Sequence, residues 1–394
     1  MKKILLLSTI LLMSMTTISS CNRTASANEE KTVEVSAPTP DEVDAAPAVT
    51  KIQVAILLDT SGSMNGLIEQ AKARLWNIVN TLTTLKYKGR TPKIEIALYE
   101  YGSSRRFDGD YIRQITPLTT DLDKISEELF SLTTGGSEEY CGTVISKATK
   151  DLEWGNNEAD MKLIYIAGNE IFEQGRISYK NAIPEALRKN IYVNTIHCGN
   201  ESTGIRDLWR DAANRGKGKF FNIDHNERVR HYVTPYDDRI SSCNARLNDT
   251  YISYGSSGYA RQQMQMRQDE NAKSVSSSNL AERAVSKSKS VYSNSEWDLV
   301  DKLSEDSNAL AEVEQEYLPS ELQGKSNKEI EKVIAEKQKE REAIQKEIND
   351  LAKKRQEYID AEMKKGNSGD DLGKAIAESI TEFANKKGYT IDKN

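Results

Sequence analysis

The hydrophobic residues of this chain follow three patterns. A short apolar run from Ile4 to Met13 stands behind two lysines at the N-terminus. Between residues 50 and 235, aliphatic runs alternate with segments in which apolar residues recur every three or four positions. Beyond residue 235 mainly the helical spacing remains, diluted by charged residues. These patterns predict an export signal, an α/β region and a helical tail.

The N-terminal segment has the charge and length of a signal peptide and is too short to span a membrane. It ends in an aliphatic residue and two small residues before Cys21, which resembles the lipobox of bacterial lipoproteins. The resemblance implies that residues 1–20 are removed and that Cys21 is acylated, for example with palmitate, as a membrane anchor. An ordinary secretory signal with an incidental cysteine is the alternative. Residues 21–49 lack periodicity and are predicted to be a disordered tether.

Residues 50–235 predict an α/β fold with a doubly wound, mostly parallel sheet. The clearest strand, 52–58, is an unbroken aliphatic run of the kind covered by helices on both faces. An amphipathic helix follows and ends near Gly89. Thr120 and Asp123 form a capping box for a later helix. The other expected strands are 94–98, 111–115, 162–167, 191–197 and 219–223, and the other expected helices are 122–132, 144–152, 182–188 and 205–215.

Composition excludes two classes of protein. The 394 residues are 37% hydrophobic with a mean hydropathy of −0.64, which excludes a polytopic membrane protein. The net charge is −6 and the sequence pI is near 5.5, without a concentrated basic stripe. Nucleic acid is therefore not an expected partner.

The strongest chemical signal follows the first predicted strand. Asp59, Ser61 and Ser63 stand on a tight loop that leads directly into a helix. Ligand sites of open α/β sheets lie beyond the carboxyl ends of the strands. Carboxylate and hydroxyl oxygens at this spacing suit Mg²⁺, Mn²⁺ or Ca²⁺. The plain structural alternative is that Asp59 or Ser61 only caps the helix.

This loop, in this place, resembles the metal-ion-dependent adhesion site (MIDAS) of the von Willebrand factor type A (VWA) family, and the resemblance covers about residues 50–224. It implies that Ser61 and Ser63 bind the cation directly and that Asp59 holds it through water. Mg²⁺ is the first choice, with Ca²⁺ and Mn²⁺ as alternatives.

Two further loops would complete such a site. A second loop usually supplies a threonine, for which Ser137 is the counterpart here, with Glu138 as a reserve oxygen donor. A third loop usually supplies an aspartate, but this chain has Asn169 and Glu170 at that place, and one of them must substitute. Because the number of negative ligands tunes metal affinity and selectivity, this departure bears on both.

The resemblance implies binding rather than catalysis, so no enzyme activity is expected. The cation keeps one open coordination position, which a carboxylate of a partner protein fills. His197, His225 and His231 have no nucleophile motif beside them and are expected to be structural or surface residues. The glycine and lysine run at 216–219 precedes a strand and is expected to be a turn rather than a phosphate loop.

The remaining cysteines suggest one pairing. Cys141 lies on the second candidate loop and Cys198 ends a strand, so both are expected at the same edge of the sheet. In an exported protein we predict a disulfide between them, and two separate buried thiols are the alternative. Cys243, in a predicted helix, would be unpaired.

The C-terminal part divides into a helical connector, 236–295, and a charged helical arm, 296–394. A helix is expected over 297–317, and another over 372–383. Between them, Ser326 and Glu329 form a capping box for a helix that runs to Lys365. Its heptad seam is interrupted by Lys337, Arg341 and Arg355. Partial coiled-coil self-association and packing against a neighbouring helix of the same chain are both compatible with this pattern.

Taken together, the sequence predicts a protein of the bacterial cell envelope, lipid-anchored to a membrane and either periplasmic or surface-exposed. Its metal site would capture an acidic group of a partner protein in adhesion or assembly. The alternative is a structural or scaffold lipoprotein whose metal site is degenerate and whose helical arm makes the important contacts.

Overall fold

The computed structural model describes residues 49–104, 109–224, 229, 231–365 and 372–392. The predicted signal peptide and Cys21 lie outside these residues, as does nearly all of the predicted tether. No helix in the described part of the chain is both long and apolar enough to cross a membrane.

The sheet elements agree closely with the predicted strands. The eight strands of the described residues are β1 (Lys51–Asp59), β2 (Leu85–Tyr87), β3 (Lys93–Tyr101), β4 (Ile112–Thr119), β5 (Met161–Gly168), β6 (Ile191–Cys198), β7 (Lys217–Ile223) and β8 (Tyr389–Ile391). Six of them form one sheet in the order β4-β3-β1-β5-β6-β7, in which only β4 runs antiparallel to its neighbour. The predicted mostly parallel sheet is confirmed.

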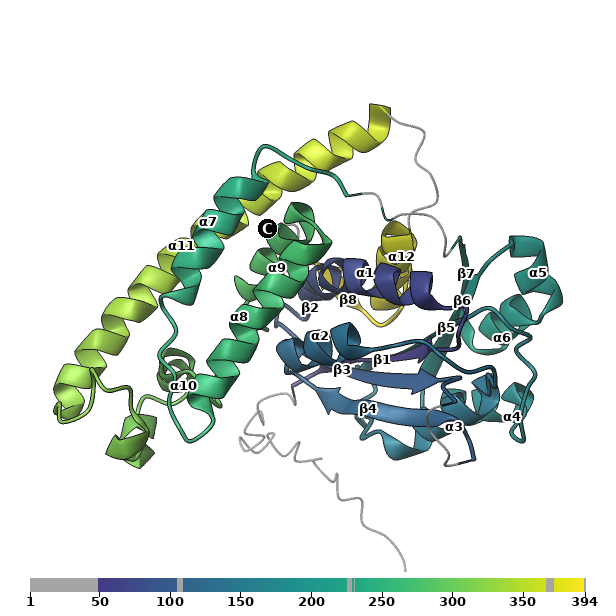
Figure 1. Ribbon diagram of the computed structural model, residues 1–394, viewed down its shortest axis with the longest axis horizontal. Coiled ribbons are helices and arrows are strands. Elements are labelled where there is room, and N and C mark those ends of the chain that lie inside the picture. Colours follow the sequence, from purple (N-terminus) through teal and green to yellow (C-terminus); the bar gives the residue numbers. More distant parts are fainter. Residues whose placement is uncertain (1–48, 105–108, 225–228, 230, 366–371, 393–394) are drawn as a thin grey trace, which may run out of the picture. The chain divides into compact units, whose positions relative to one another are not determined.

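Helices cover both faces of this sheet (Figure 1). The first group is α1 (Asn65–Thr83), α2 (Leu122–Ser131), α3 (Cys141–Asp151), α4 (Tyr179–Arg188), α5 (Glu201–Arg206) and α6 (Trp209–Arg215). The helix expected over 205–215 is divided into α5 and α6, because Leu208 between them adopts a left-handed backbone with φ of 74°.

Side-chain alternation along β1 creates two separate cores. Val54 and Leu58 face the core with α1 and α2, whereas Ala55 and Leu57 face the core with α3, α4 and α6. Because successive residues of a strand point to opposite faces, an unbroken aliphatic run can fill both cores.

The expected disulfide is not formed. Cys141 and Cys198 are both free, buried thiols. Cys141 belongs to the core with α3 and α4, while Cys198 points into the core on the other face of the sheet. The sequence placed both cysteines at one edge of the sheet. Which face of the sheet each side chain occupies could be determined only from the strand register. Cys243 is also a free thiol, as expected.

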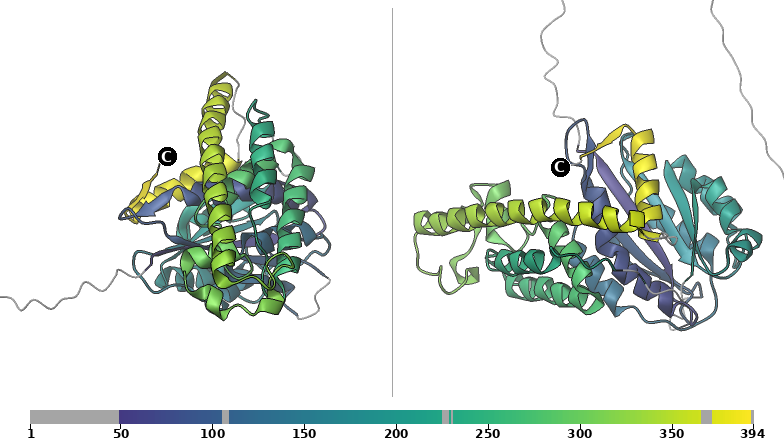
Figure 2. Two further views of the ribbon diagram at one scale, coloured as in Figure 1. Left: turned by 90° about the vertical axis from the view of Figure 1, so that its left-hand side faces the viewer. Right: turned by 90° about the horizontal axis from the view of Figure 1, so that it is seen from above.

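The second half of the chain is helical, as predicted, and Figure 2 shows its long helix alongside the shorter ones. Its helices are α7 (Asp237–Asn248), α8 (Gly258–Val275), α9 (Ser277–Lys287), α10 (Leu299–Glu305), α11 (Asn327–Lys365) and α12 (Leu372–Lys386). Short 3₁₀ turns at Ala309–Glu312 and Gln315–Tyr317 replace most of the helix expected over 297–317. The expected capping box of α11 is formed in part: Glu329 accepts hydrogen bonds from the backbone and side chain of Ser326 at 2.9 and 2.7 Å, whereas the Glu329 N–H bonds to the carbonyl of Ser326.

Two arginines that interrupt the seam of α11 make buried ion pairs within the chain. Arg341 bonds to Asp298 and Asp301, each at 2.6 Å, and Arg355 bonds to Asp237 at 2.9 Å. The helix therefore packs its seam against its own neighbours, chiefly α7, with further contacts to α10 and α9 (Figures 1 and 2). The sequence allowed either coiled-coil self-association or packing against a neighbouring helix of the same chain. The structure shows the second for the seam of α11.

The end of the chain returns to the α/β sheet. The helix α12 packs on α1 and β7, and its residues Ile376, Ile380 and Phe383 belong to the same core as β1. The adjoining β8 pairs antiparallel with β2, which follows α1. The α/β layer is thus completed by a helix about 150 residues beyond β7 in the sequence.

A buried ionic cluster joins α2 to the helices that follow. Arg283 of α9 bonds to Asp123 at 2.7 Å and to Asp269 of α8 at 2.6 Å, and Lys287 lies 3.0 Å from Asp269. The side chains of Arg283 and Lys287 are fully buried. Asp123 was expected in a capping box, but Asp121 caps α2 instead by accepting from the backbone of Lys124 at 2.9 Å.

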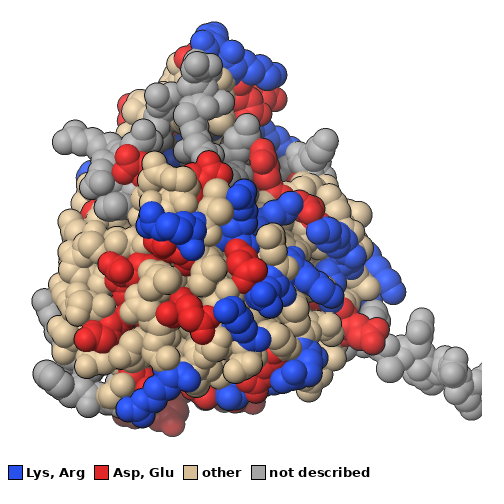
Figure 3. Space-filling view, turned by 90° about the vertical axis from the view of Figure 1, so that its right-hand side faces the viewer, with Lys and Arg blue, Asp and Glu red and all other residues tan. Residues whose placement is uncertain are grey.

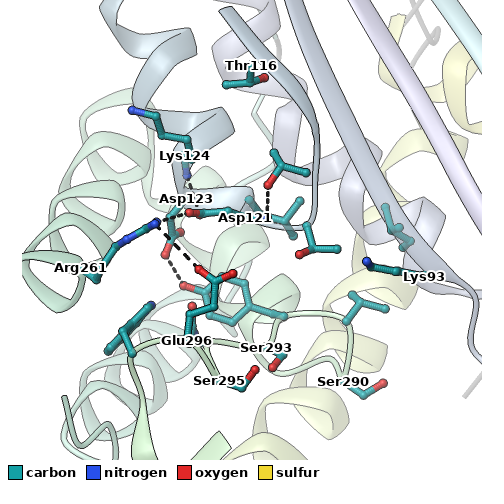
Figure 4. Close-up of a pocket in the computed structure, with 18 of the residues that line it drawn as sticks. Lys93, Thr116, Asp121, Asp123, Lys124, Arg261, Ser290, Ser293, Ser295 and Glu296 are labelled. Carbon is teal, nitrogen blue, oxygen red and sulfur yellow. Dashed lines mark hydrogen bonds and ion pairs between the residues drawn. The ribbon is translucent and has the colours of Figure 1, made fainter. Parts of the chain in front are cut away.

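A cavity of about 960 Å³ lies between the start of α2 and the helical region. Figure 4 shows Arg261 of α8 at its wall, directed toward Asp121 and Glu296. Lys124 pairs with two glutamates of its own helix. Arg261 and Lys124 are therefore both paired with carboxylates.

Candidate functional site

Three loops meet beyond the carboxyl ends of the central strands, where ligand sites of such sheets lie. The first follows β1 and carries Asp59, Ser61 and Ser63. The second precedes α3, and the third follows β5. Backbone hydrogen bonds join the first two loops, from Gly62 to Gly136 at 3.1 Å and from Gly135 to Thr60 at 2.8 Å.

Close packing around Asp59 depends on glycine. A Cβ atom on Gly168 would lie 2.5 Å from the hydroxyl of Tyr101 and 3.1 Å from Asp59 Oδ2. Gly136, with φ of 126°, has no room for a side chain either, because a Cβ would lie 2.2 Å from the carbonyl oxygen of Gly102. These glycines let three loop backbones approach one carboxylate.

The predicted residues of the first and third loops come together. Asp59 is fully buried, and its Oδ1 accepts from the backbone N–H of Ser61 at 2.7 Å. The hydroxyls of Ser61 and Ser63 lie 3.4 Å apart. Ser63 donates to Asn169 Oδ1, also at 3.4 Å, so the first and third loops are in contact. These four side chains present hydroxyl, amide and carboxylate oxygens, which are the ligands of hard cations.

The second loop differs from the expectation. Ser137 is exposed, and its hydroxyl bonds to the adjacent Glu138 at 3.2 Å. No described contact joins Ser137 or Glu138 to the first loop. The next residue, Glu139, is only 2% exposed, and its carboxyl interacts with both Asp59 and Ser61. Its Oε2 also accepts from the backbone of Glu170 at 3.3 Å, which connects the second and third loops.

Sequence reasoning missed Glu139. The loop reads Ser137-Glu138-Glu139-Tyr140, and two adjacent glutamates offer no periodic signal that tells which one points inward. The position of Glu139 two residues before α3 was the available clue, since the start of that helix fixes its direction.

Asp59 and Glu139 form a pair of buried carboxyls. Burial raises the pKa of Asp59, and burial together with the charge of Asp59 raises the pKa of Glu139. The nearby carboxylate of Glu170 adds to both shifts. Asp59 Oδ2 is buried, and no hydrogen-bond donor reaches it among the described residues. A protonated Glu139 carboxyl would supply one. Such a pair favours either a shared proton or a bound cation.

Glu139 supplies a negative charge in place of the aspartate that the third loop lacks. The third loop has Asn169 where the related sites usually have an aspartate, and Glu139 brings a buried carboxylate to the same cluster. One divalent cation would balance Asp59 and Glu139. The donor set therefore fits a hard divalent cation, although no three His, Cys, Asp or Glu residues in the described ranges form a metal cluster by themselves.

The histidines and thiols nearby have structural roles. His197 is 1% exposed, bonds to Asn222 at 2.8 Å and packs against Trp209. Burial raises the pKa of the Cys141 and Cys198 thiols, which keeps them protonated. His225 lies outside the described residues, and His231 bonds to Ser276 at 3.1 Å.

Sequence comparison identifies the family of the α/β region. Residues 53–233 match the von Willebrand factor type A domain. Such domains are protein-binding modules, typically without catalytic activity and often with a MIDAS metal site. A search of curated proteins found no match.

Several solved structures are similar to this chain at low identity. One is the conserved hypothetical protein BatB from Bacteroides thetaiotaomicron, with 18% identity over 44% of this chain and 90% of the other, and a TM-score of 0.34. An aerotolerance-related membrane protein from Bacteroides fragilis has 16% identity over 44% of this chain and 92% of the other, with a TM-score of 0.32. Proximal thread matrix protein 1 from mussel byssus, with a zinc-occupied MIDAS motif, has 14% identity over 45% of this chain and 43% of the other, with a TM-score of 0.35. Similarity at this level adds nothing to the family assignment.

Proposed function

We propose that this protein is a lipid-anchored binding protein of the bacterial cell envelope that captures an acidic group of a partner protein through a divalent cation. The observation that carries the proposal is a chain of contacts from Asp59 to Ser61, from Ser61 to Ser63 and from Ser63 to Asn169, next to a buried carboxylate oxygen, Asp59 Oδ2, for which no hydrogen-bond donor is found among the described residues. Mg²⁺ is the expected ion, and Ca²⁺ and Mn²⁺ are alternatives with the same preference for oxygen.

The proposed ligand set is revised by the contacts. Ser61 and Ser63 contribute hydroxyls, while Asp59 and Glu139 contribute the negative charge. Glu170 is exposed at the rim and raises the local negative charge, so it stays a secondary candidate, as do Ser137 and Glu138. When bound, the cation would supply a positive centre with a coordination position for an oxygen of the partner.

The chain's own residues determine what can approach the metal. Ser61 and Asp59 are buried, whereas Glu170 and Ile171 are exposed beside them, the latter with 43% of its surface accessible. The side of the molecule bearing α5 and α6 shows acidic and basic side chains interspersed among uncharged ones (Figure 3). Such a surface supports a protein partner rather than the phosphate backbone of a nucleic acid.

Calorimetric titration of Mg²⁺, Mn²⁺ and Ca²⁺ tests the metal site. The wild-type protein should bind at least one ion, and Asp59→Ala and Ser61→Ala should abolish the heat. Glu139→Gln should weaken binding by roughly tenfold or more, because it removes one of two charges that balance the cation. Glu138→Gln is the matched control and should bind as the wild type does.

The outcome also separates the proposal from its rival. If no ion gives heat or raises the melting temperature of the folded wild-type protein, the metal-dependent function fails. A partner captured equally well with and without chelator would then support the scaffold alternative, in which the helical arm makes the contacts. Loss of capture in chelator, with recovery on adding Mg²⁺, supports capture through the metal.

A further inference from the structure

A second pocket, of about 220 Å³, lies along α3 beside the loop that precedes β4 and the segment that precedes α4. Its wall includes Thr143 and Ser146 from the buried side of α3, and Lys147 and Lys150 from the next turn. Arg176 closes it from the opposite segment. None of these residues belongs to the proposed metal ligands.

One buried hydroxyl in this pocket, that of Thr143, lacks a partner within the described part of the chain. Thr143 is 4% exposed and Ser146 is 3% exposed. The Oγ1 atom of Thr143 is buried and has no hydrogen-bond partner among the described residues. A buried hydroxyl without a partner is costly, so its presence on a pocket wall indicates an acceptor that comes from outside the chain.

The pocket also has an excess of positive charge. Lys147, Lys150 and Arg176 face two carboxylates, Asp110 and Asp151, so the lining carries one net positive charge. Lys147 pairs with Asp110 at 3.2 Å, and Lys150 pairs with Glu185, outside the lining, at 3.4 Å. Arg176, in contrast, forms no ion pair with a described residue. The guanidinium and the two hydroxyls are donors, and the first turn of the 11-residue α3 adds a partial positive charge on the same side.

We propose that this pocket binds a compact oxyanion, either a carboxylate or a phosphate group, through the hydroxyls of Thr143 and Ser146 and the cations of Arg176 and Lys147. A bound cation is disfavoured because three cationic side chains line the wall. The oxyanion can come from an acidic side chain of a partner or from a free anion. The site itself does not require the proposed metal function, since none of its groups is a metal ligand.

The pocket is nevertheless joined to the metal loop. Glu139 precedes the first residue of α3 by two positions, and Gly142 packs so tightly against the segment before α4 that a Cβ would lie 2.0 Å from the carbonyl oxygen of Ile177. A partner with two acidic groups could therefore place one at the metal and the other in this pocket. This last step, unlike the pocket, rests on the proposed function.

Phosphate titration of the metal-free protein, followed by ³¹P NMR and by melting temperature, tests the pocket. Inorganic phosphate should bind the wild type, and both Thr143→Val and Arg176→Gln should weaken binding by roughly tenfold. Thr143→Val should also raise the melting temperature without phosphate by about 2 °C, because it removes an unsatisfied buried hydroxyl while keeping the side-chain shape. Lys180→Gln, on the exposed side of α4, is the control and should bind as the wild type does.

The results are decisive in either direction. If phosphate and acetate both fail to bind the folded wild type at millimolar concentrations, or if Thr143→Val binds phosphate unchanged, the pocket is not an oxyanion site. A fall in the melting temperature of Thr143→Val would show that the hydroxyl is satisfied within the fold, which also overturns the proposal. A hexa-aspartate peptide then distinguishes the source: displacement of phosphate indicates a partner's side chain, and phosphate binding without displacement indicates a free anion.

Discussion

Replacing Arg283 with methionine should destabilise the protein strongly. Arg283 is fully buried, bonds to Asp123 at 2.7 Å and to Asp269 at 2.6 Å, and stacks on the ring of Trp76. Methionine keeps most of the apolar volume but removes the charge. The substitution therefore isolates the ionic contribution of the cluster.

The size of the destabilisation depends on which partners Asp269 and Asp123 retain in the variant. Asp269 would retain Lys287 at 3.0 Å, which together with Arg283 lowers its pKa despite burial. Asp123 would retain only the hydroxyl of Tyr292 at 2.6 Å. One buried carboxylate is thus left without a cation, which costs about 3–5 kcal/mol. Loss of the stacking on Trp76 adds about 1 kcal/mol. The total loss of about 4–6 kcal/mol is a large part of the stability of an ordinary domain.

Urea unfolding of a protein spanning residues 48–394, which form one compact unit, provides the measurement. Arg239→Met is the control, because Arg239 is 63% exposed at its side chain and pairs loosely with Glu347 at 3.5 Å. It should change the unfolding free energy by less than about 0.5 kcal/mol. Adding Asp123→Asn to Arg283→Met should recover part of the loss, since it removes the unpaired charge.

The effect should also depend on pH. Burial already raises the pKa of Asp123 in the wild type, with Arg283 opposing the shift. Without Arg283 the pKa rises further, so the folded state binds a proton more readily than the unfolded state, and the penalty shrinks as pH falls. If Arg283→Met costs less than about 1 kcal/mol at neutral pH with an unchanged m-value, the cluster is not a buried contact between α2 and the later helices.

Three further outcomes are expected. A chain that ends at Lys365 lacks α12 and exposes the core of the sheet. It should be insoluble on expression or unfolded by circular dichroism. A folded, soluble product would instead show that the end of the chain is a detachable arm. Burial and Asp298 raise the pKa of Asp301 to about 6, so the folded state binds more protons than the unfolded state between about pH 4 and 6, and stability falls as pH rises through this range. The unfolding free energy of Asp301→Asn, relative to that of the wild type, should therefore increase by about 2 kcal/mol from pH 4 to pH 7. A difference that does not change with pH would contradict the assignment. Finally, Cys21→Ser should shift the protein from the membrane to the aqueous fraction and abolish palmitate labelling, and unchanged fractionation would refute lipid anchoring.

Local pattern determined much of the α/β region. The aliphatic run of β1 had to be a buried strand, because only a strand covered on both faces buries every residue of such a run. Its position also put Asp59, Ser61 and Ser63 on the loop where ligands bind, and the structure brings these side chains together. The sequence was sufficient here because the information lies within about a dozen adjacent residues.

Residues that act through distant contacts could not be assigned in this way. Glu139 points toward Asp59 only because the start of α3 and three glycine-containing loops fix its direction. Asp123 looked like a capping residue, but Arg283, 160 positions further along the chain, makes it part of a buried cluster. The predicted pairing of Cys141 and Cys198 is wrong because the two side chains lie on opposite faces of the sheet.

The sequence by itself determined the six strands of the main sheet, the loop motif at Asp59 and the helical nature of the tail. The tertiary structure decided that α12 closes the α/β layer, that α11 pairs Arg341 and Arg355 with its own chain, and that Thr143 lines a second pocket. The physical reason is that hydrophobic periodicity records which face of an element is buried, but not which other element covers it. That choice depends on shape and charge complementarity between segments far apart in the chain.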